Sequence, residues 1–120
     1  MKILILTIGL FISMHLNAQQ TSCEDLIEYV EKNGYKKGSV GAIQLIQSTW
    51  LKNVEAYSID NTLVVIAEIK KDSYGFSTKH YIFCGIPESN WDYFSGFYSL
   101  TTTYGERFQK YIIDYQCDCY

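Results

Sequence analysis

Four cysteines constrain the fold of this chain more than any other feature of its sequence. They are Cys23, Cys84, Cys117 and Cys119, in a chain of 120 residues. A disulfide between Cys117 and Cys119 would close a very tight, strained ring, so we expect Cys23 to pair with one of them and Cys84 with the other. Either pairing ties the last residues to two elements that are distant in sequence. A thiolate zinc site is the alternative, but the paired Cys-x-x-Cys spacing typical of such sites is missing.

The first residues predict an oxidising compartment in which such disulfides form. Lys2 precedes an apolar run over 3–11, and Ala18 ends a small-residue segment, which is the pattern of a secretory signal peptide spanning 1–18. The run is shorter than the ~20 residues of a spanning helix, so we expect no stable membrane anchor. Cys23 lacks the residues that precede a lipidated cysteine. The sequence therefore predicts an exported protein, periplasmic or extracellular, with one domain over 19–120.

Charge and histidine content argue against several functions. Without the predicted signal peptide, which contains Lys2 and His15, the chain carries nine basic and thirteen acidic residues, a net charge of −4, and its remaining histidine is His80. These numbers exclude a multi-histidine metal site and argue against nucleic acid as a partner. His80 and Cys84 would share a strand face but lie about 13 Å apart, too far for a nucleophile and its base. We therefore predict no catalytic residues, no metal and no cofactor.

Hydrophobic periodicity predicts an α+β fold. A helix is expected from Thr21, with Glu24 at capping-box spacing, to Gly34. A basic loop is expected over 35–39 and a strand over 42–47. Further strands are predicted over 52–58, 63–67 and 79–84, and Asp60-Asn61 supplies a turn. Because short connections separate these segments, they should form a small antiparallel sheet of three or four strands.

Two helices are predicted after the sheet. Pro87 begins the first, and Thr103 with Glu106 caps the second, whose apolar stripe runs to Tyr115. The apolar stripe of the first helix comprises Trp91, Phe94, Phe97 and Tyr98. The predicted strands are apolar on both faces, so both faces need cover. We expect the two C-terminal helices on one face and the N-terminal helix, held through Cys23, on the other.

Several short segments from Ser48 onwards follow the pattern of a known family in order and spacing. They are Ser48-Thr49 with Leu51, Tyr57, Leu63 to Ile69, Tyr81-Ile82-Phe83, Gly85-Ile86-Pro87 and Gly105 to Ile112. Over about 48–115 the chain thus resembles the KTSC domain, a small module named after the C-terminal extension of some lysyl-tRNA synthetases. Phe83 replaces a tyrosine of the family pattern, Gln109 replaces an asparagine, and one extra residue precedes Tyr57. The resemblance implies a β-rich module followed by helices, with an unassigned activity for which RNA binding is suggested.

Aromatic side chains are the unusual feature of the composition. After the signal peptide the chain has eighteen of them, more than a core of this size easily holds. We expect exposed rings at Trp50, Tyr74, Phe76, Tyr98 and Tyr120. Exposed rings beside lysines can anchor a protein or stack on a sugar. The predicted binding residues, around the connection between the last two strands, are Lys70, Lys71, Tyr74, Phe76, Lys79, Tyr81 and Phe83.

These features predict a non-catalytic interaction module with a protein or glycan partner. The alternative is an immunity or inhibitor protein, whose acidic residues would dock against the basic active site of an exported toxin or hydrolase. A minimal hydrolase that uses Ser48, His80 or Asp92 is a third hypothesis, which no motif favours.

Overall fold

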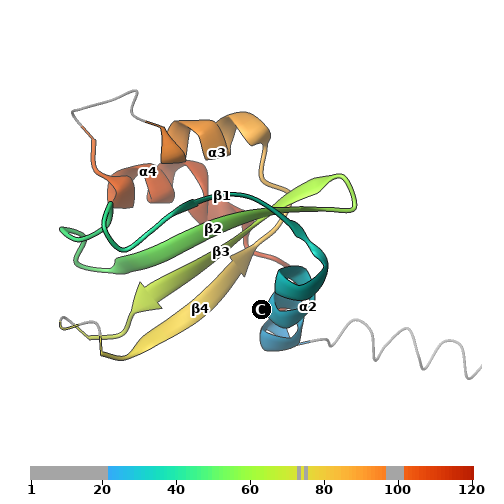
Figure 1. Ribbon diagram of the computed structural model, residues 1–120, viewed down its shortest axis with the longest axis horizontal. Helices are drawn as coiled ribbons and strands as arrows, with labels where there is room; N and C mark the ends of the chain where they lie inside the picture. The colour runs from blue at the N-terminus through green and yellow to red at the C-terminus, as the bar shows by residue number, and fades with distance from the viewer. Residues whose placement is uncertain (1–21, 73, 75, 97–101) are drawn as a thin grey trace, which may run out of the picture.

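The structure, a computed structural model, describes residues 22–72, 74, 76–96 and 102–120. A four-stranded antiparallel sheet carries one helix on one face and two helices on the other (Figure 1). The elements are α2 (Cys23–Asn33), β1 (Tyr35–Val40), β2 (Leu51–Ile59), β3 (Thr62–Lys70), β4 (Thr78–Phe83), α3 (Glu88–Ser95), α4 (Tyr104–Tyr111) and the 3-10 helix η1 (Ile113–Tyr115). The strands lie in sequence order, so β1 and β4 form the two edges. The predicted α+β class and antiparallel sheet are confirmed.

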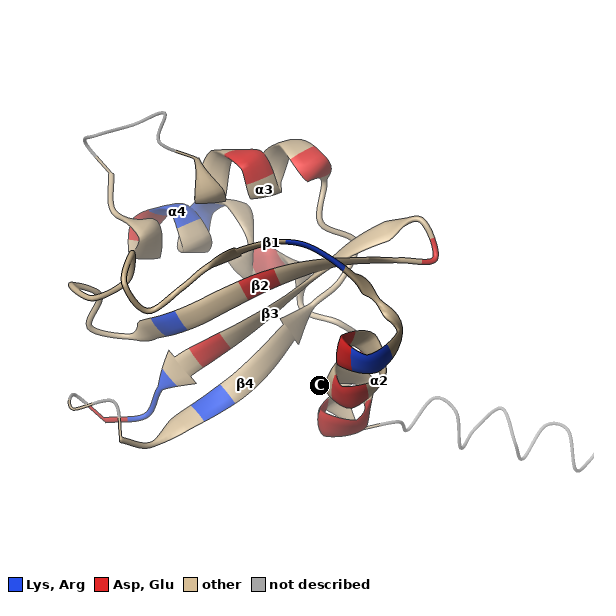
Figure 2. Ribbon diagram, viewed as in Figure 1, with Lys and Arg blue, Asp and Glu red and all other residues tan. Residues whose placement is uncertain are grey.

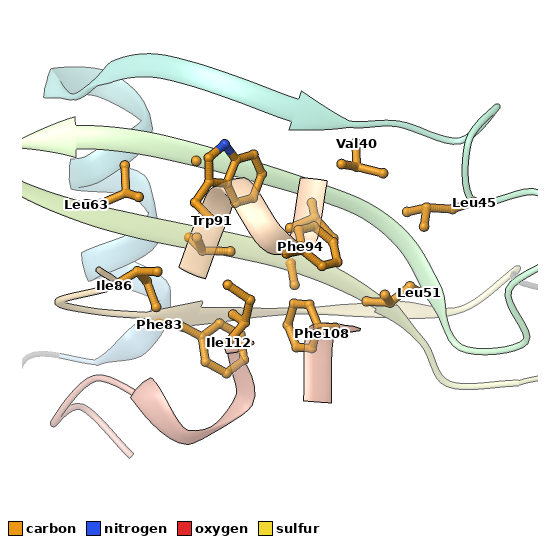
Figure 3. Packing of buried hydrophobic residues seen from close by; sticks show 14 residues of the cluster. Val40, Leu45, Leu51, Leu63, Phe83, Ile86, Trp91, Phe94, Phe108 and Ile112 are labelled. Atoms are coloured by element: carbon orange, nitrogen blue, oxygen red, sulfur yellow. The ribbon is translucent and has the colours of Figure 1, made fainter. Parts of the chain in front are cut away.

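Each face of the sheet has its own hydrophobic cluster, as the two-sided apolar pattern predicts. Under α3 and α4 the largest fully buried side chains are Leu51, Phe83, Phe94, Phe108 and Ile112 (Figure 3). The cluster under α2 comprises Ile27, Val30, Tyr57, Val64, Ile66, Ile82 and Cys117. Alternate residues of β3 and β4 supply the two clusters, because successive side chains of a strand point to opposite faces. The predicted cover of both faces is therefore confirmed.

Two disulfides hold the last residues of the chain against the rest of the fold. Cys23 at the start of α2 is bonded to Cys119, 96 residues later, and Cys84 after β4 is bonded to Cys117. The structure thus selects one of the two pairings that the sequence left open. It also explains how α2 is held near β4, since the tail that carries Cys119 runs along that strand.

Two segments between α2 and β2 differ from the prediction. The expected loop over 35–39 is the edge strand β1, which pairs with β2 and buries only Val40. An edge strand with one buried residue has no alternating apolar pattern, so periodicity could not reveal it. The expected strand over 42–47 is instead a series of turns that buries Leu45. Backbone bonds from Leu45 N–H to Gly41 O and from Ser48 N–H to Leu45 O close these turns.

The helix ends also refine the prediction. Ser22 caps α2, with its hydroxyl accepting a hydrogen bond from the Asp25 N–H at 3.0 Å, while the predicted cap Thr21 lies outside the described residues. Trp91 and Phe94 of the α3 stripe are buried, and Phe97 and Tyr98 lie outside the described residues. The last helix ends at Tyr111, and the chain continues as η1 to Tyr115.

The capping box at the start of α4 provides a direct test of this part of the fold. The Thr103 hydroxyl accepts from the Glu106 N–H at 3.1 Å, and the Glu106 carboxylate accepts from the Thr103 N–H at 2.9 Å. We expect Thr103→Ala to lower the free energy of unfolding by about 1 kcal/mol, because one N–H of the first turn loses its partner. Thr103→Ser keeps the hydroxyl and should cost only a fraction of that. Urea denaturation measures both, and equal losses would contradict the capping role.

Candidate functional site

The connection between β3 and β4 is organised by one carboxylate. Asp72 accepts hydrogen bonds from the backbone N–H groups of Tyr74 at 3.0 Å, and of Phe76 and Ser77 at 3.2 Å. An aspartate that bonds the backbone ahead of it is a common way to stabilise a turn. The turn therefore fixes the backbone at the two positions that carry the aromatic rings.

The two rings on this turn face solvent. Tyr74 is 80% exposed and Phe76 is 89% exposed, and their rings stack with centroids 6.0 Å apart. Apart from each other, these rings have no ring partner among the described residues. Two large apolar side chains that the fold leaves in water are typical of an interaction site. The expected exposure of Tyr74 and Phe76 is confirmed.

A second pair of apolar side chains lies at the same end of the sheet. Ile43 is 85% exposed and Ile46 is 77% exposed, both on the turns between β1 and β2. In an antiparallel sheet the β1–β2 and β3–β4 connections emerge at one end, as Figure 1 shows at the left of the molecule. Together with Tyr74 and Phe76 they are the four most exposed large hydrophobic residues of the described chain. We call this end, with these four residues, the hairpin end.

Sequence reasoning missed the two isoleucines because their segment was assigned to a strand. The run from Ala42 to Gln47 does not alternate between apolar and polar residues, and this was the available sign against a strand. Leu45 is the residue of these turns that enters the core, so Ile43 and Ile46 on either side of it remain in water.

Lysines surround the hairpin end. Lys52, Lys70, Lys71 and Lys79 lie on or next to the strand ends there (Figure 2), with Glu68 and Asp72 as the nearby acidic residues in the two last strands and their turn. The Lys70 Nζ donates a hydrogen bond to the Ser48 carbonyl at 2.7 Å, which links the end of β3 to the turns before β2. The hairpin end is therefore more basic than the chain as a whole.

The remaining predicted binding residues lie away from this surface. Phe83 is 1% exposed and packs edge-on against Phe108 with centroids 5.3 Å apart, so it belongs to the core and cannot contact a partner. Tyr81 is half-buried, stacks on the Tyr120 ring at 6.2 Å, and has the Lys79 ammonium 5.1 Å from its centroid. Tyr120 is exposed as expected. Trp50, also expected in solvent, is half-buried against the Phe108 ring at 5.6 Å.

On the face that α2 covers, towards the end of β1 and β2 that is remote from the hairpin end, a small polar network links the two strands. Burial raises the pKa of Glu55, but the hydrogen bonds from Lys36 at 2.9 Å and from the Tyr57 hydroxyl at 2.8 Å hold that pKa below its ordinary value overall. Burial, together with the neighbouring Glu55 carboxylate, raises the pKa of Tyr57. Both groups keep their ordinary charge near neutral pH, so this network holds β1 and β2 together and does not resemble an acid–base pair.

We searched the described part of the chain for metal ligands and for the serine of the hydrolase hypothesis. No three His, Cys, Asp or Glu side chains gather there in a way that could hold a metal ion. The Ser48 hydroxyl, named above for a minimal hydrolase, accepts hydrogen bonds from the N–H groups of Trp50 and Leu51 at 3.3 and 2.9 Å. Ser48 therefore stabilises the turn before β2. Among the residues that the structure describes, no helix is long and apolar enough to cross a membrane.

Comparison with known proteins adds no assignment to this picture. No protein-family model, curated protein or solved structure matches the chain. The KTSC resemblance therefore remains a prediction from the sequence.

Proposed function

We propose that the chain is an exported, disulfide-stabilised, KTSC-like module without catalysis, and that its hairpin end binds a protein partner. One observation carries the proposal: the four most exposed large hydrophobic residues lie together at this end, although they come from two separate connections. Burying such side chains against a partner is favourable, and aromatic anchors commonly dominate such contacts. The two disulfides agree with export into an oxidising compartment.

A protein fits the hairpin end better than a glycan does. Sugars stack on aromatic rings, but Ile43 and Ile46 offer no ring and no hydrogen bond to a hydroxyl. An aliphatic and aromatic surface with lysines around it matches a protein patch that is apolar in the middle and acidic at the edge.

The test compares two double variants that each remove two exposed rings. We expect Tyr74→Ala with Phe76→Ala to weaken binding to the partner by at least about tenfold, since truncating anchor residues has effects of this size. The matched control is Tyr29→Ala with Tyr35→Ala, which removes two exposed rings from α2 and from the start of β1. The control should bind as tightly as the unchanged protein. The partner is first sought by crosslinking in the compartment that receives the protein, and affinity is then measured with the purified pair.

The same experiment distinguishes the alternative function. α2 carries several acidic residues (Figure 2), and the exposed ones are Glu24, Asp25, Glu28 and Glu31. The inhibitor function would replace the module function under three conditions. The captured partner is an exported hydrolase or toxin, and its activity falls on binding. Binding also depends on these carboxylates instead of the hairpin rings. Binding that survives the hairpin variants unchanged would reject the proposed role of the hairpin end.

A further inference from the structure

We propose that the cleft between α2 and the edge strand β4 binds an extended polypeptide segment, which adds to the sheet beside β4 and places a basic side chain against Glu24 and Glu31. This site is separate from the tips of the hairpin end and does not depend on the function proposed for them.

The backbone of β4 is covered along only half of its outer edge. The Ile82 N–H donates to the Tyr120 hydroxyl at 2.8 Å, and the Ile82 carbonyl accepts from the Cys117 N–H at 3.4 Å. The Cys84 N–H likewise donates to the Tyr115 carbonyl at 2.7 Å. The tail therefore covers this edge over Ile82 to Cys84, as an added strand would.

The other half of the edge remains open. The backbone groups of successive residues in an antiparallel strand point alternately to its two sides. Because the groups of Ile82 point outward, those of Thr78 and His80 point outward as well. No backbone partner for these outward groups lies among the described residues. The opposite edge of the sheet is less suited to pairing, since the register of β1 shifts between Lys36 and Gly38, and such bulges hinder strand addition.

A cleft of about 760 Å³ lies along this open half of the edge. One wall is α2, and the other is Thr78, Lys79 and His80 of β4. The Cys23–Cys119 disulfide and Tyr120 also line it. The side chain of Lys79 points to the opposite face of β4 from the side chains of Thr78 and His80. A cleft that all three residues line must therefore run along the outer edge of β4. Its volume is within the range of ligand sites in proteins.

The two walls together select the ligand class. Outward N–H and C=O groups at every second residue match the backbone of an extended chain, which is how peptides add to exposed sheet edges. On the helix wall, Glu24, Ile27 and Glu31 lie at helical spacing on one face of α2, and both carboxylates are exposed. Side chains of an added strand that point towards α2 would meet these carboxylates, and basic side chains suit them.

The strand wall makes the recognition selective. Lys71, Lys79 and His80 line the cleft opposite the helix. A segment that is basic at every position would be repelled by these lysines. A segment with basic residues at alternate positions places them towards α2 and presents its other side chains to the face of Tyr81 and Lys79. The expected ligand is therefore an extended segment with alternating basic and apolar residues.

The first test is a titration of the ¹⁵N-labelled, disulfide-bonded protein, followed by NMR. The probe is a peptide of about six residues with alternating lysine and valine, capped at both ends. We expect the largest shifts at the amides of Thr78 and His80, and slower hydrogen exchange of the His80 N–H. The same peptide with N-methylated backbone at alternate residues keeps its charge but cannot pair with β4. It should bind about tenfold more weakly.

The second test changes the helix wall. Glu24→Gln with Glu31→Gln should weaken the probe about fivefold, because two carboxylates at the ligand lose their charge. The matched control is Asp25→Asn with Glu28→Gln, which removes the same charge from exposed α2 positions that do not line the cleft. Equal weakening by both pairs, full affinity of the N-methylated peptide, or shifts confined to the hairpin end would each overturn the proposal. Pairing of two copies through β4 in the absence of peptide would also overturn it.

Discussion

Replacing Phe108 by alanine should lower the free energy of unfolding by about 3–5 kcal/mol, the range measured for large aromatic deletions in cores. Phe108 is 0% exposed and lies at the centre of the cluster between the sheet and α3 and α4. Its ring makes edge contacts with Trp50, Phe83 and Phe94 at centroid distances of 5.6, 5.3 and 5.7 Å. The deletion therefore removes contacts to three separate parts of the chain, of which Phe83 and Phe94 are visible in Figure 3, and leaves a cavity in a closely packed core.

The measurement is urea denaturation at neutral pH with both disulfides intact. Phe76→Ala is the matched control, because it deletes the same side chain at a position that is 89% exposed. It should change stability by no more than about 0.5 kcal/mol. If the two substitutions cost the same, the assignment of Phe108 to the core and of Phe76 to the surface is wrong. An unchanged stability of Phe76→Ala would also show that removal of this hairpin ring does not unfold the protein.

The sequence predicts those parts of the fold in which the buried residues form a periodic apolar pattern along the chain. The apolar run over 63–67 lies in β3, the interior strand between β2 and β4, and the stripe that begins at Tyr104 follows α4 and continues into η1. β1 left no such pattern, because hydrogen bonds to β2 define it and only Val40 is buried. The turns over 42–47 resemble a strand in sequence because four of the six residues are apolar, although only Leu45 is buried.

The candidate sites likewise have parts that the sequence predicts and parts that it does not. Tyr74 and Phe76 could be placed on the surface because turn residues surround them in the sequence. Phe83 is among the predicted binding residues, but its place on the face under α3 and α4 puts it in the core. The cleft beside β4 could not be predicted, since it exists only where α2 and β4 meet. The Cys23–Cys119 disulfide, whose pairing the sequence left open, lines this cleft.

Removal of the Cys23–Cys119 disulfide by Cys23→Ala with Cys119→Ala should cost about 2–5 kcal/mol of stability, because the bond closes a long loop. The loop spans 96 residues. The loss should not be uniform across the molecule. α2 contributes Ile27 and Val30 as its buried residues, and the bridge holds it to the tail. We therefore expect the amides of α2 to lose hydrogen-exchange protection before those of β3.

The second bridge serves as the matched control. Cys84→Ala with Cys117→Ala removes a disulfide that spans 33 residues and bonds the tail to the end of β4, not to α2. It should also destabilise the protein, but it should leave α2 no less protected relative to the sheet than before. Loss of α2 protection in both variants alike would show that the bridges stabilise the fold only as general crosslinks. Selective loss in the first variant, with loss of peptide binding at the cleft, would show that the Cys23–Cys119 bridge builds the helix wall on which that binding depends.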